Sequence, residues 1–342
     1  MVTIRQIAEE AGVSRGTVDR VINYRQGVNP DTEKRVREIA ERLGYKPSVP
    51  GKMLAAKKKK IKIGFLVFDT PVALFFRDVY SAAKQKALEM DNLGISVKFY
   101  KAKQLDEQYL AGVLEQVEKD HLDGLILAPL HLPVFSEFLK RIEKSGIPAV
   151  FYNVDNDEGS RLSYVGCDYK ESGRVAAGLT ALSINNKGPI GIATVLDEKS
   201  PSSYERLMGF RKEIKKENPD ITIINEDADY IFQENNCDAI LELVEKHPEM
   251  KALYVINPGD CSIFEKVMAR AANKDLKIIT NDLLQKQRQL LKKGIITATI
   301  GQQPDVQGTL PIQMLYDYLV LGSMPQKDKI YTSLQIYIKQ NL

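Results

Sequence analysis

The hydrophobic pattern changes near residue 60, and the two sides of that point predict different architectures. Before it, apolar residues recur every three or four positions in short segments, as one face of an amphipathic helix requires. After it, short apolar runs alternate with longer amphipathic segments. Such alternation is typical of parallel β-sheets covered by helices on both faces. We therefore expect a small helical domain followed by a larger α/β region.

Residues 1–46 predict a helix-turn-helix domain of three helices. In the first helix the apolar residues follow helical spacing: Ile4, Ile7, Ala8 and Ala11. Gly12 permits the backbone conformation that ends this helix, and Ser14 can cap the next one by accepting the amide hydrogen of Thr17. The third helix extends from Pro30 to about Leu43, with Asn29 as its cap. Its apolar residues complete the core: Val36, Ile39, Ala40 and Leu43.

The second helix has an apolar face and a polar face that carries arginines. The apolar face is formed by Val18, Val21 and Ile22, and the polar face by Arg15, Gly16, Asp19, Arg20 and Asn23. A helix of this kind, braced by a partner at a glycine-containing turn, suits the DNA major groove. The alternative is an ordinary small helical bundle with a solvated face.

The charge distribution favours DNA binding. Residues 1–60 contain 14 Lys or Arg and 7 Asp or Glu, whereas the other 282 residues contain 34 basic and 38 acidic side chains. The overall net charge of +3 therefore combines a basic N-terminal domain with a slightly acidic remainder. Phosphate binding requires a local positive surface of this kind.

Residues 47–60 allow two interpretations. One is a flexible, charged linker that ends in Lys57 to Lys60. The other is a short helix that Ser48 caps and Pro50 starts, with Met53 and Leu54 exposed. Two turns are too few for a helix to persist alone in water. We therefore expect this segment to fold only when a partner copy and DNA support it.

From residue 61 onward the pattern predicts strands separated by helices. The expected strands are 61–68, 95–100, 124–128, 149–153, 190–195, 221–224, 252–256, 277–280 and 298–301. The clearest expected helices are 76–90, 108–119, 134–145 and 169–184. Nine strands in about 240 residues suit two sheets better than one. Ligands of such sheets bind beyond the carboxyl ends of the strands.

Composition places few further constraints. The 342 residues allow two or three domains, and no run of about 18 apolar residues predicts a membrane span. The N-terminus lacks the pattern of a secretion signal, so we expect a cytoplasmic protein. The cysteines are scattered and odd in number: Cys167, Cys237 and Cys261. With three histidines, they suggest no metal-ligand cluster, and we expect neither a metal nor another cofactor.

Polar and aromatic residues concentrate where the expected strands end. They include Asp69, Phe75, Phe76, Asn153, Asp155, Tyr204, Arg206, Asn257, Asp260, Asn281, Asp282 and Gln302. Carboxylates, amides and guanidinium groups pair with adjacent hydroxyls, and aromatic faces cover the C–H side of a sugar ring, so the mixture favours a carbohydrate pocket. Each residue also has an ordinary structural explanation, such as capping the next helix.

An enzyme acting on sugars is the main alternative, since α/β folds host many chemistries. The sequence contains no glycine-rich phosphate loop, no Gly-x-Ser-x-Gly motif and no metal-binding cluster. We therefore expect no enzymatic activity.

The chain resembles the lactose-repressor (LacI) family of bacterial transcription regulators over essentially its whole length. The N-terminal motif is Ile4-x-x-Ile7-Ala8-x-x-Ala11-Gly12-Val13-Ser14-x-x-Thr17-Val18-x-Arg20-Val21-Ile22-Asn23, followed by Leu43-Gly44-Tyr45-x-Pro47. The remainder is similar to sugar-binding proteins of the ribose type. Its signatures include Phe75-Phe76, Ile147-Pro148, Val165-Gly166, Arg206-x-x-Gly209-Phe210 and Thr299-Ile300-Gly301-Gln302-Gln303-Pro304.

The resemblance implies a helix-turn-helix headpiece (1–46), a hinge helix and linker (47–60) and a two-lobed, periplasmic-binding-protein-like core of type I (61–342). The N-lobe would comprise about 61–166 and 301–324, and the C-lobe 167–300 and 325–342. The chain would cross between the lobes near Gly166, Gly301 and Met324.

Candidate site residues follow from these positions. For DNA they are Thr3, Ser14, Arg15, Gly16, Thr17, Arg20, Asn23, Lys52 and Leu54. For an effector they are Phe75, Phe76, Asn153, Asp155, Arg206, Tyr230, Asn257, Asp282 and Gln302. The C-lobe aromatic contact could equally be Phe232.

The sequence departs from the family pattern at several positions. Gly16 replaces a larger base-reading side chain, and Asp19 replaces a serine near the phosphates. Ala128 stands where ribose binders carry an asparagine, and Asn153 where many carry an aspartate. The effector is therefore expected to differ from ribose.

The resemblance implies a homodimer that binds a near-palindromic operator as a repressor. A small carbohydrate in the cleft would control operator affinity, with a purine or another cyclic molecule as the alternative effector. Induction and corepression both occur on this scaffold, so the sign of the response stays open.

Overall fold

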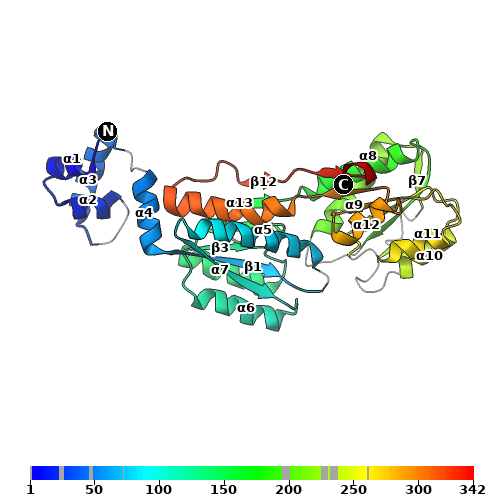
Figure 1. Cartoon of the computed structure of the whole chain (residues 1–342), viewed down its shortest axis with the longest axis horizontal. Helices are drawn as coiled ribbons and strands as arrows, with labels where there is room; N and C mark the ends of the chain where they lie inside the picture. The colour runs from blue at the N-terminus through cyan, green and yellow to red at the C-terminus, as the bar shows by residue number, and fades with distance from the viewer. Residues whose placement is uncertain are drawn as a thin grey trace. The chain divides into compact units, whose positions relative to one another are not determined.

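The computed structural model describes residues 2–22, 27–45, 49–71, 73–194, 201–224, 230–231, 238–259 and 262–342. For 49–50, 52, 54–55 and 230–231 only the backbone is described. The chain divides into two compact units, Met1–Lys59 and Lys60–Leu342. Figure 1 shows the helices and strands of both units.

Within its described residues, the first unit begins with the expected three-helix domain. Its helices are α1 (Ile4–Ala11), α2 (Arg15–Ile22) and α3 (Pro30–Arg42). The buried core comprises Ile7, Ala8, Ala11, Val18, Val21, Val36 and Ala40. Gly12 takes the left-handed conformation at φ +64°, and Ser14 Oγ accepts the Thr17 amide hydrogen at 3.1 Å. Asn29 caps α3 by accepting the Asp31 amide hydrogen at 2.9 Å.

A further helix, α4 (Val49–Lys59), ends this unit. Its 11 residues make about three turns, one more than the sequence suggested. Ala56 and the lysines from Lys57 to Lys59 favour helix and extend it at its C-terminal end. The presence of the helix supports the second interpretation of this segment, and its dependence on a partner copy and DNA stays a prediction. The proposed cap Ser48 lies outside the described residues.

Within the described residues, the second unit contains two largely parallel sheets. The first sheet has the order β12-β5-β4-β3-β1-β2. Its strands are β1 (Ile61–Phe68), β2 (Ile95–Ala102), β3 (Gly124–Leu127), β4 (Ala149–Tyr152), β5 (Ser163–Gly166) and β12 (Lys329–Tyr331). Helices α5 (Leu74–Asp91) and α13 (Pro304–Tyr316), continued by η1 (Asp317–Leu321), pack together against it. Helices α6 (Glu107–Lys119) and α7 (Pro133–Ser145) lie on the other side (Figure 1).

The second sheet has the order β13-β11-β10-β9-β6-β7, with β8 also paired to β6. Its strands are β6 (Gly188–Thr194), β7 (Ile221–Ile223), β8 (Tyr230–Ile231), β9 (Ala252–Ile256), β10 (Lys277–Asn281), β11 (Ala298–Gly301) and β13 (Gln335–Tyr337). One face packs against α8 (Tyr169–Ser183) and α9 (Ser202–Glu217). The other packs against α10 (Asp238–Lys246), α11 (Ile263–Arg270) and α12 (Gln285–Lys292). A short 3-10 turn, η2 (Lys339–Asn341), ends the chain.

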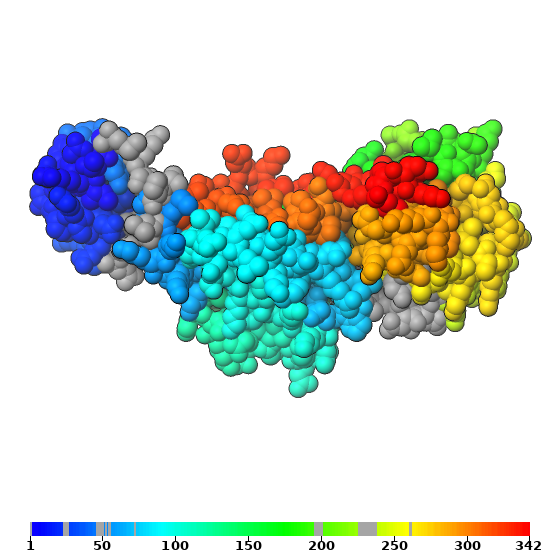
Figure 2. All heavy atoms as spheres, in the orientation of Figure 1, coloured from blue at the N-terminus to red at the C-terminus, as the bar shows by residue number. Residues whose placement is uncertain are grey.

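We call each sheet with its helices a lobe. The chain passes from the first lobe to the second after Gly166, and returns after Gly301, as expected. The third crossing differs from the expectation. It falls between Tyr331 and Gln335 rather than near Met324, because β12 pairs with β5 in the first sheet and β13 pairs with β11 in the second. Figure 2 shows α13, in orange, beside the cyan surface of α5.

Candidate DNA-recognition helix and ligand pocket

Helix α2 presents the expected polar face to solvent. Arg15, Gly16 and Arg20 are exposed, whereas Val18 and Val21 are fully buried against the other helices. Thr17 is partly exposed, and its hydroxyl lies 2.9 Å from that of Ser14. The arginine side chains are therefore accessible from one side of the helix.

The two unusual residues of α2 have different surroundings. A Cβ at Gly16 would meet only Ser14 Oγ, at 3.7 Å, so packing within the unit does not require a glycine there. Asp19 is partly buried. The pKa of Tyr45 is raised mainly by the burial of Tyr45 and also by the negative charge of Asp19. The carboxylate therefore lies near its own domain's Tyr45.

The remaining DNA candidates are only partly described. Thr3 is exposed and caps α1, because its Oγ accepts the Gln6 amide hydrogen while Gln6 Oε1 accepts that of Thr3. Asn23 lies outside the described residues, as do the side chains of Lys52 and Leu54. DNA contact by any of these residues stays a prediction.

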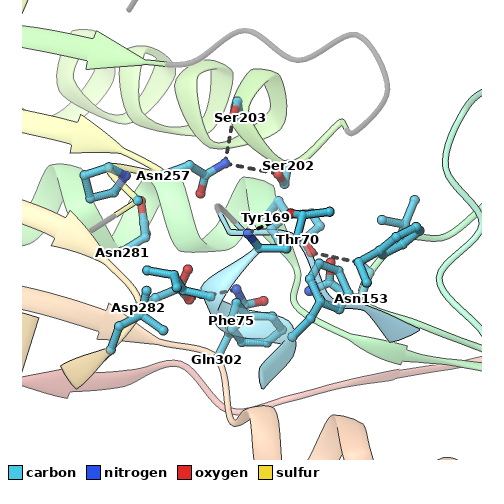
Figure 3. A pocket seen from close by; sticks show the side chains of 18 of the residues that line it. Thr70, Phe75, Asn153, Tyr169, Ser202, Ser203, Asn257, Asn281, Asp282 and Gln302 are labelled. Carbon is cyan, nitrogen blue, oxygen red and sulfur yellow. Dashed lines mark hydrogen bonds between the residues drawn. The ribbon is translucent and has the colours of Figure 1, made fainter. Parts of the chain in front are cut away.

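The second unit contains a cavity of about 180 Å³ between its two sheets (Figure 3). First-lobe residues on its wall are Phe68, Thr70, Ala73, Leu74, Phe75, Phe76, Leu105, Leu130, Asn153 and Val154. The rest of the wall begins with Tyr169, the first residue of α8, and continues with Ser202, Ser203, Arg206, Asn257, Pro258, Gly259, Asn281, Asp282, Leu284, Gln287 and Gln302. The pocket thus lies beyond the carboxyl ends of the strands, where such sheets bind ligands.

Three polar residues of the pocket adopt left-handed backbone conformations directly after a strand. Asn153 follows β4 with φ +59°, Asn257 follows β9 with φ +52°, and Asp282 follows β10 with φ +68°. Residues other than glycine seldom take this conformation, although Asn and Asp tolerate it best. Such strain tends to persist at functional sites, where it fixes the direction of a side chain.

Arg206 is the most deeply buried charge of the pocket, with 1% of its surface exposed. Its Nη1 donates to Asn257 Oδ1, its Nε donates weakly to Ser172 Oγ at 3.4 Å, and its guanidinium lies 4.8 Å from the centre of the Tyr169 ring. Among the described residues its Nη2 has no acceptor. A buried donor without an acceptor is costly, so this nitrogen is suited to a ligand oxygen.

The position of Arg206 depends on a close approach of α8 and α9. A Cβ at Gly173 would lie 2.0 Å from the carbonyl oxygen of Arg206, and one at Gly209 would lie 2.1 Å from that of Lys170. Only glycine allows the two helices to touch through their backbones at these points. The family signature around Arg206 therefore includes a packing residue as well as a polar one.

Hydrogen bonds fix the other polar side chains of the pocket. Asn257 Nδ2 donates to Ser203 Oγ at 2.7 Å and to Ser202 Oγ at 3.2 Å. Gln302 Nε2 donates to Asp282 Oδ1 at 2.8 Å. Burial raises the pKa of Asp282, and Arg206 and Gln302 offset part of that rise.

Asn153 is linked to the same network from the first lobe. Its Nδ2 donates to Gln307 Oε1 at 3.3 Å, and Gln307 Nε2 donates to the carbonyl oxygen of Gln302 at 2.9 Å. Tyr164 and Tyr169 both donate to the carbonyl oxygen of Asn153, at 2.8 and 2.7 Å. The polar groups of the two lobes therefore meet through Gln307.

Seven of the nine effector candidates line the pocket: Phe75, Phe76, Asn153, Arg206, Asn257, Asp282 and Gln302. Asp155 does not. Its carboxylate forms ion pairs outside the cavity, with Arg161 at 2.6 Å and with Lys329 at 2.7 Å. Burial alone would raise the pKa of Asp155, but these two cations hold that pKa below its usual range. The Tyr230 side chain and Phe232 lie outside what the structure describes, so the choice between them stays open.

Sequence reasoning missed several pocket residues. Thr70, Ser202, Ser203 and Gln287 gave no signal, because single hydroxyl and amide side chains are common in loops and helices. Tyr169 was expected only as a helix residue, and its contact with Arg206 depends on packing between α8 and α9.

Comparison with known proteins assigns both units. Residues 3–48 match the model of bacterial regulatory proteins of the lacI family, and residues 63–323 match that of the periplasmic binding protein domain. The chain belongs to the periplasmic-binding-protein domain family, and its N-terminal domain is a helix-turn-helix domain of the lacI type. Its core is a periplasmic-binding-protein domain of type I.

Curated relatives agree with this assignment. The chain is 26% identical over 220 residues to catabolite control protein A of Staphylococcus aureus, and 27% identical over 259 residues to that of Priestia megaterium. These alignments cover 64% and 74% of this chain. The chain spans 62% of the length of the first relative and 73% of the second.

Solved structures share the fold of the second unit. One is a Bacteroides fragilis protein described as a LacI transcriptional regulator, with a TM-score of 0.71 and 21% identity. Another is a glucose–galactose binding protein from Geobacillus stearothermophilus, with a TM-score of 0.70 and 20% identity. Each comparison covers 82% of this chain and 98% of the other. Separately, no helix in the described part of this chain has the length and apolar character to cross a membrane.

Proposed function

We propose that this chain is a sequence-specific DNA-binding repressor whose operator affinity is controlled by a small neutral carbohydrate in the pocket between its lobes. The observation that carries the proposal is the pocket itself, in which hydrogen-bonding groups are fixed by their neighbours while Arg206 Nη2 lacks an acceptor among the described residues. The same chain carries a helix-turn-helix unit with exposed arginines.

Helix α2 supplies the base-reading groups. Arg15 and Arg20 can each form paired hydrogen bonds to guanine in the major groove, worth about 1–3 kcal/mol of discrimination per contact. Lys57 to Lys60 would contact phosphates without regard to sequence, so this part of the affinity should fall with salt. A homodimer would place two such helices on a near-palindromic site.

The two walls of the pocket fit opposite sides of a sugar ring. The first lobe contributes mainly apolar groups, with Phe75 and Phe76 near edge-to-face at 82°. The second contributes Arg206, Asn257 and Asp282, and Gln302 joins them from the crossing directly after Gly301. These groups pair with hydroxyl groups. Among the described wall residues, Arg206 and Asp282 are one cation and one anion, so a strongly charged ligand is disfavoured.

Ligand binding is coupled to DNA through the lobes. A carbohydrate that contacts both walls would favour one orientation of the lobes, and so change the spacing of α4 in the two copies of a dimer. Coupling of about 1–3 kcal/mol is typical of such systems. Depending on which orientation fits the operator, the sugar acts as inducer or corepressor.

The test is selection of binding sites from a randomised duplex library by the purified chain. The wild type should enrich a near-palindrome, and Arg20→Ala should bind with little preference for sequence while still binding sugars. Arg35→Ala is the matched control, because Arg35 is exposed on α3 and not on α2. It should retain the same preference.

Binding to the selected duplex is then measured with and without D-glucose, D-galactose, D-ribose, D-arabinose and adenine. A change of about 5- to 150-fold with one of the sugars supports the proposal. A response to adenine alone would identify the aromatic wall as a base-stacking surface and reject a carbohydrate effector. Because the sugar acts either as inducer or as corepressor, the selection is run without ligand and with each of the five compounds, and failure of the wild type to enrich any sequence under all of these conditions would refute the DNA-binding function.

A further inference from the structure

Gln287, the third residue of α12, lies on the wall of the pocket with an unsatisfied side-chain oxygen. Only 1% of its surface is exposed, and among the described residues its Oε1 has no hydrogen-bond donor. A carbonyl oxygen buried without a donor destabilises the protein, so such groups are rare in folded chains. A ligand that supplies a donor would remove this cost.

One long hydrogen bond to a neighbour favours one orientation of the Gln287 amide. Its Nε2 donates to the carbonyl oxygen of Gly259 at 3.4 Å, and the reversed amide would place two acceptor oxygens against each other. The bond is long, so it restrains the amide only weakly. The last torsion of a glutamine side chain is broad, and a small rotation can therefore turn Oε1 toward the cavity at low cost.

Gln287 adds a second acceptor to the polar wall. Asp282, five residues earlier, uses Oδ1 to accept from Gln302 and retains further acceptor capacity on its carboxylate. Arg206 Nη2, on the same wall, is a donor without an acceptor among the described residues. This wall therefore suits a molecule with several hydroxyl groups, each able both to donate and to accept.

We infer that Gln287 determines effector specificity, because its Oε1 accepts a hydrogen bond from one hydroxyl group of the bound carbohydrate. This inference rests on the proposed function, since it places a carbohydrate in this pocket. A sugar that lacks the hydroxyl leaves Oε1 buried without a donor and binds more weakly.

The experiment is calorimetric titration of the full chain with D-glucose, D-galactose, D-ribose and D-arabinose, then with each monodeoxy derivative of the sugar that binds best. For one derivative the wild type should lose about tenfold in affinity, or about 1.4 kcal/mol. Gln287→Leu should bind the parent sugar about tenfold more weakly and no longer distinguish it from that derivative. Gln289→Leu is the matched control, because Gln289 is exposed on the same helix. It should behave as the wild type does.

Two further measurements separate this role from a structural one. Without sugar, Gln287→Leu should unfold at the same temperature as the wild type or higher, because the substitution removes an unsatisfied oxygen. Gln287→Asn keeps an amide, with a donor for the Gly259 carbonyl oxygen and an acceptor for the sugar, and should retain more of the discrimination against the deoxy sugar than Gln287→Leu does. It also serves if the leucine variant fails to fold.

The possible failures are distinguishable. If the sugars bind but Gln287→Leu still discriminates as the wild type does, the role of Gln287 is overturned and the proposed function stands. If none of the four sugars binds the wild type, the carbohydrate part of the proposed function fails and this inference fails with it.

Discussion

Replacing Gly173 by alanine should force α8 and α9 apart and displace Arg206. The added Cβ would lie 2.0 Å from the Arg206 carbonyl oxygen and 2.9 Å from the Phe210 amide nitrogen. Real Cβ contacts essentially never fall below 3.0 Å, so the helices must separate by about 1 Å. Both neighbouring atoms belong to helical backbone, which cannot rotate away as a side chain can.

The magnitude follows from two opposing terms. Overpacking of this kind costs about 1–3 kcal/mol, and contact with backbone places Gly173→Ala at or above the upper end. Alanine recovers about 1 kcal/mol in a helix interior. We therefore expect the free energy of unfolding to fall by about 2 kcal/mol or more. Gly178→Ala is the matched control, since nothing lies within 4 Å of a Cβ there, and it should instead gain about 0.5–1 kcal/mol.

Urea unfolding followed by far-ultraviolet circular dichroism measures both variants, because the chain contains no tryptophan. The transition of the larger unit is the relevant one, since the two units need not unfold together. Sugar affinity should fall in Gly173→Ala and stay unchanged in Gly178→Ala. A Gly173→Ala midpoint equal to or above that of the wild type would show that α8 and α9 are not in backbone contact.

Two further predictions concern carboxylates. Asp155→Ala removes the partner that Arg161 and Lys329 share, so it should lower the free energy of unfolding by about 1.5–3 kcal/mol. Sugar affinity, measured by titration, should stay unchanged. A selective loss of sugar affinity would return Asp155 to the effector site. Burial raises the pKa of Asp282 in the folded chain above its unfolded value of about 3.9. Protonation of Asp282 therefore stabilises the folded state fully below the unfolded pKa, and this contribution is lost as pH rises through the folded pKa. The difference in stability between Asp282→Asn and the wild type should therefore grow in favour of the asparagine variant as pH rises through that range, and a difference independent of pH would contradict the assigned shift.

The sequence predicts the three-helix domain well because its determinants are local. Apolar spacing, the left-handed Gly12, and the caps Ser14 and Asn29 each act within a few residues. All nine expected strands also occur, with small differences at their ends, because buried parallel strands are short apolar runs.

The sequence does not predict β5, β8, β12 or β13. The buried β5 has only four residues and includes Ser163 and Gly166, so it is not a continuous apolar run, and β8 has only two residues. The β12 and β13 segments lie at sheet edges and are mostly exposed, so nothing in their composition distinguishes them from loops. Their pairing, and with it the third crossing between lobes, depends on contacts with β5 and β11 far away in the sequence. Short edge strands are generally difficult to predict for this reason.

The pocket was only partly predictable, as Asn153 and Asp155 illustrate. Both follow β4, but the left-handed turn at Asn153 places it on the pocket wall, whereas Asp155 pairs with Arg161 and with Lys329 of the distant β12. Sequence position alone cannot separate these outcomes. Gln287 gave no signal at all, because its unsatisfied oxygen is a property of packing.

The unequal construction of the two pocket walls has a consequence for redesign of the protein as a biosensor. Residues such as Asn257 and Asp282 are tied to neighbours by hydrogen bonds, so changing one leaves Ser203 or Gln302 to find a new partner. The only interaction described for the Phe75 side chain is contact between aromatic rings. Aromatic or aliphatic replacements of Phe75 can therefore be combined with other substitutions more freely. A library that varies the aromatic side first, and alters the polar side only in matched pairs, should yield more folded sensors with new ligand preferences.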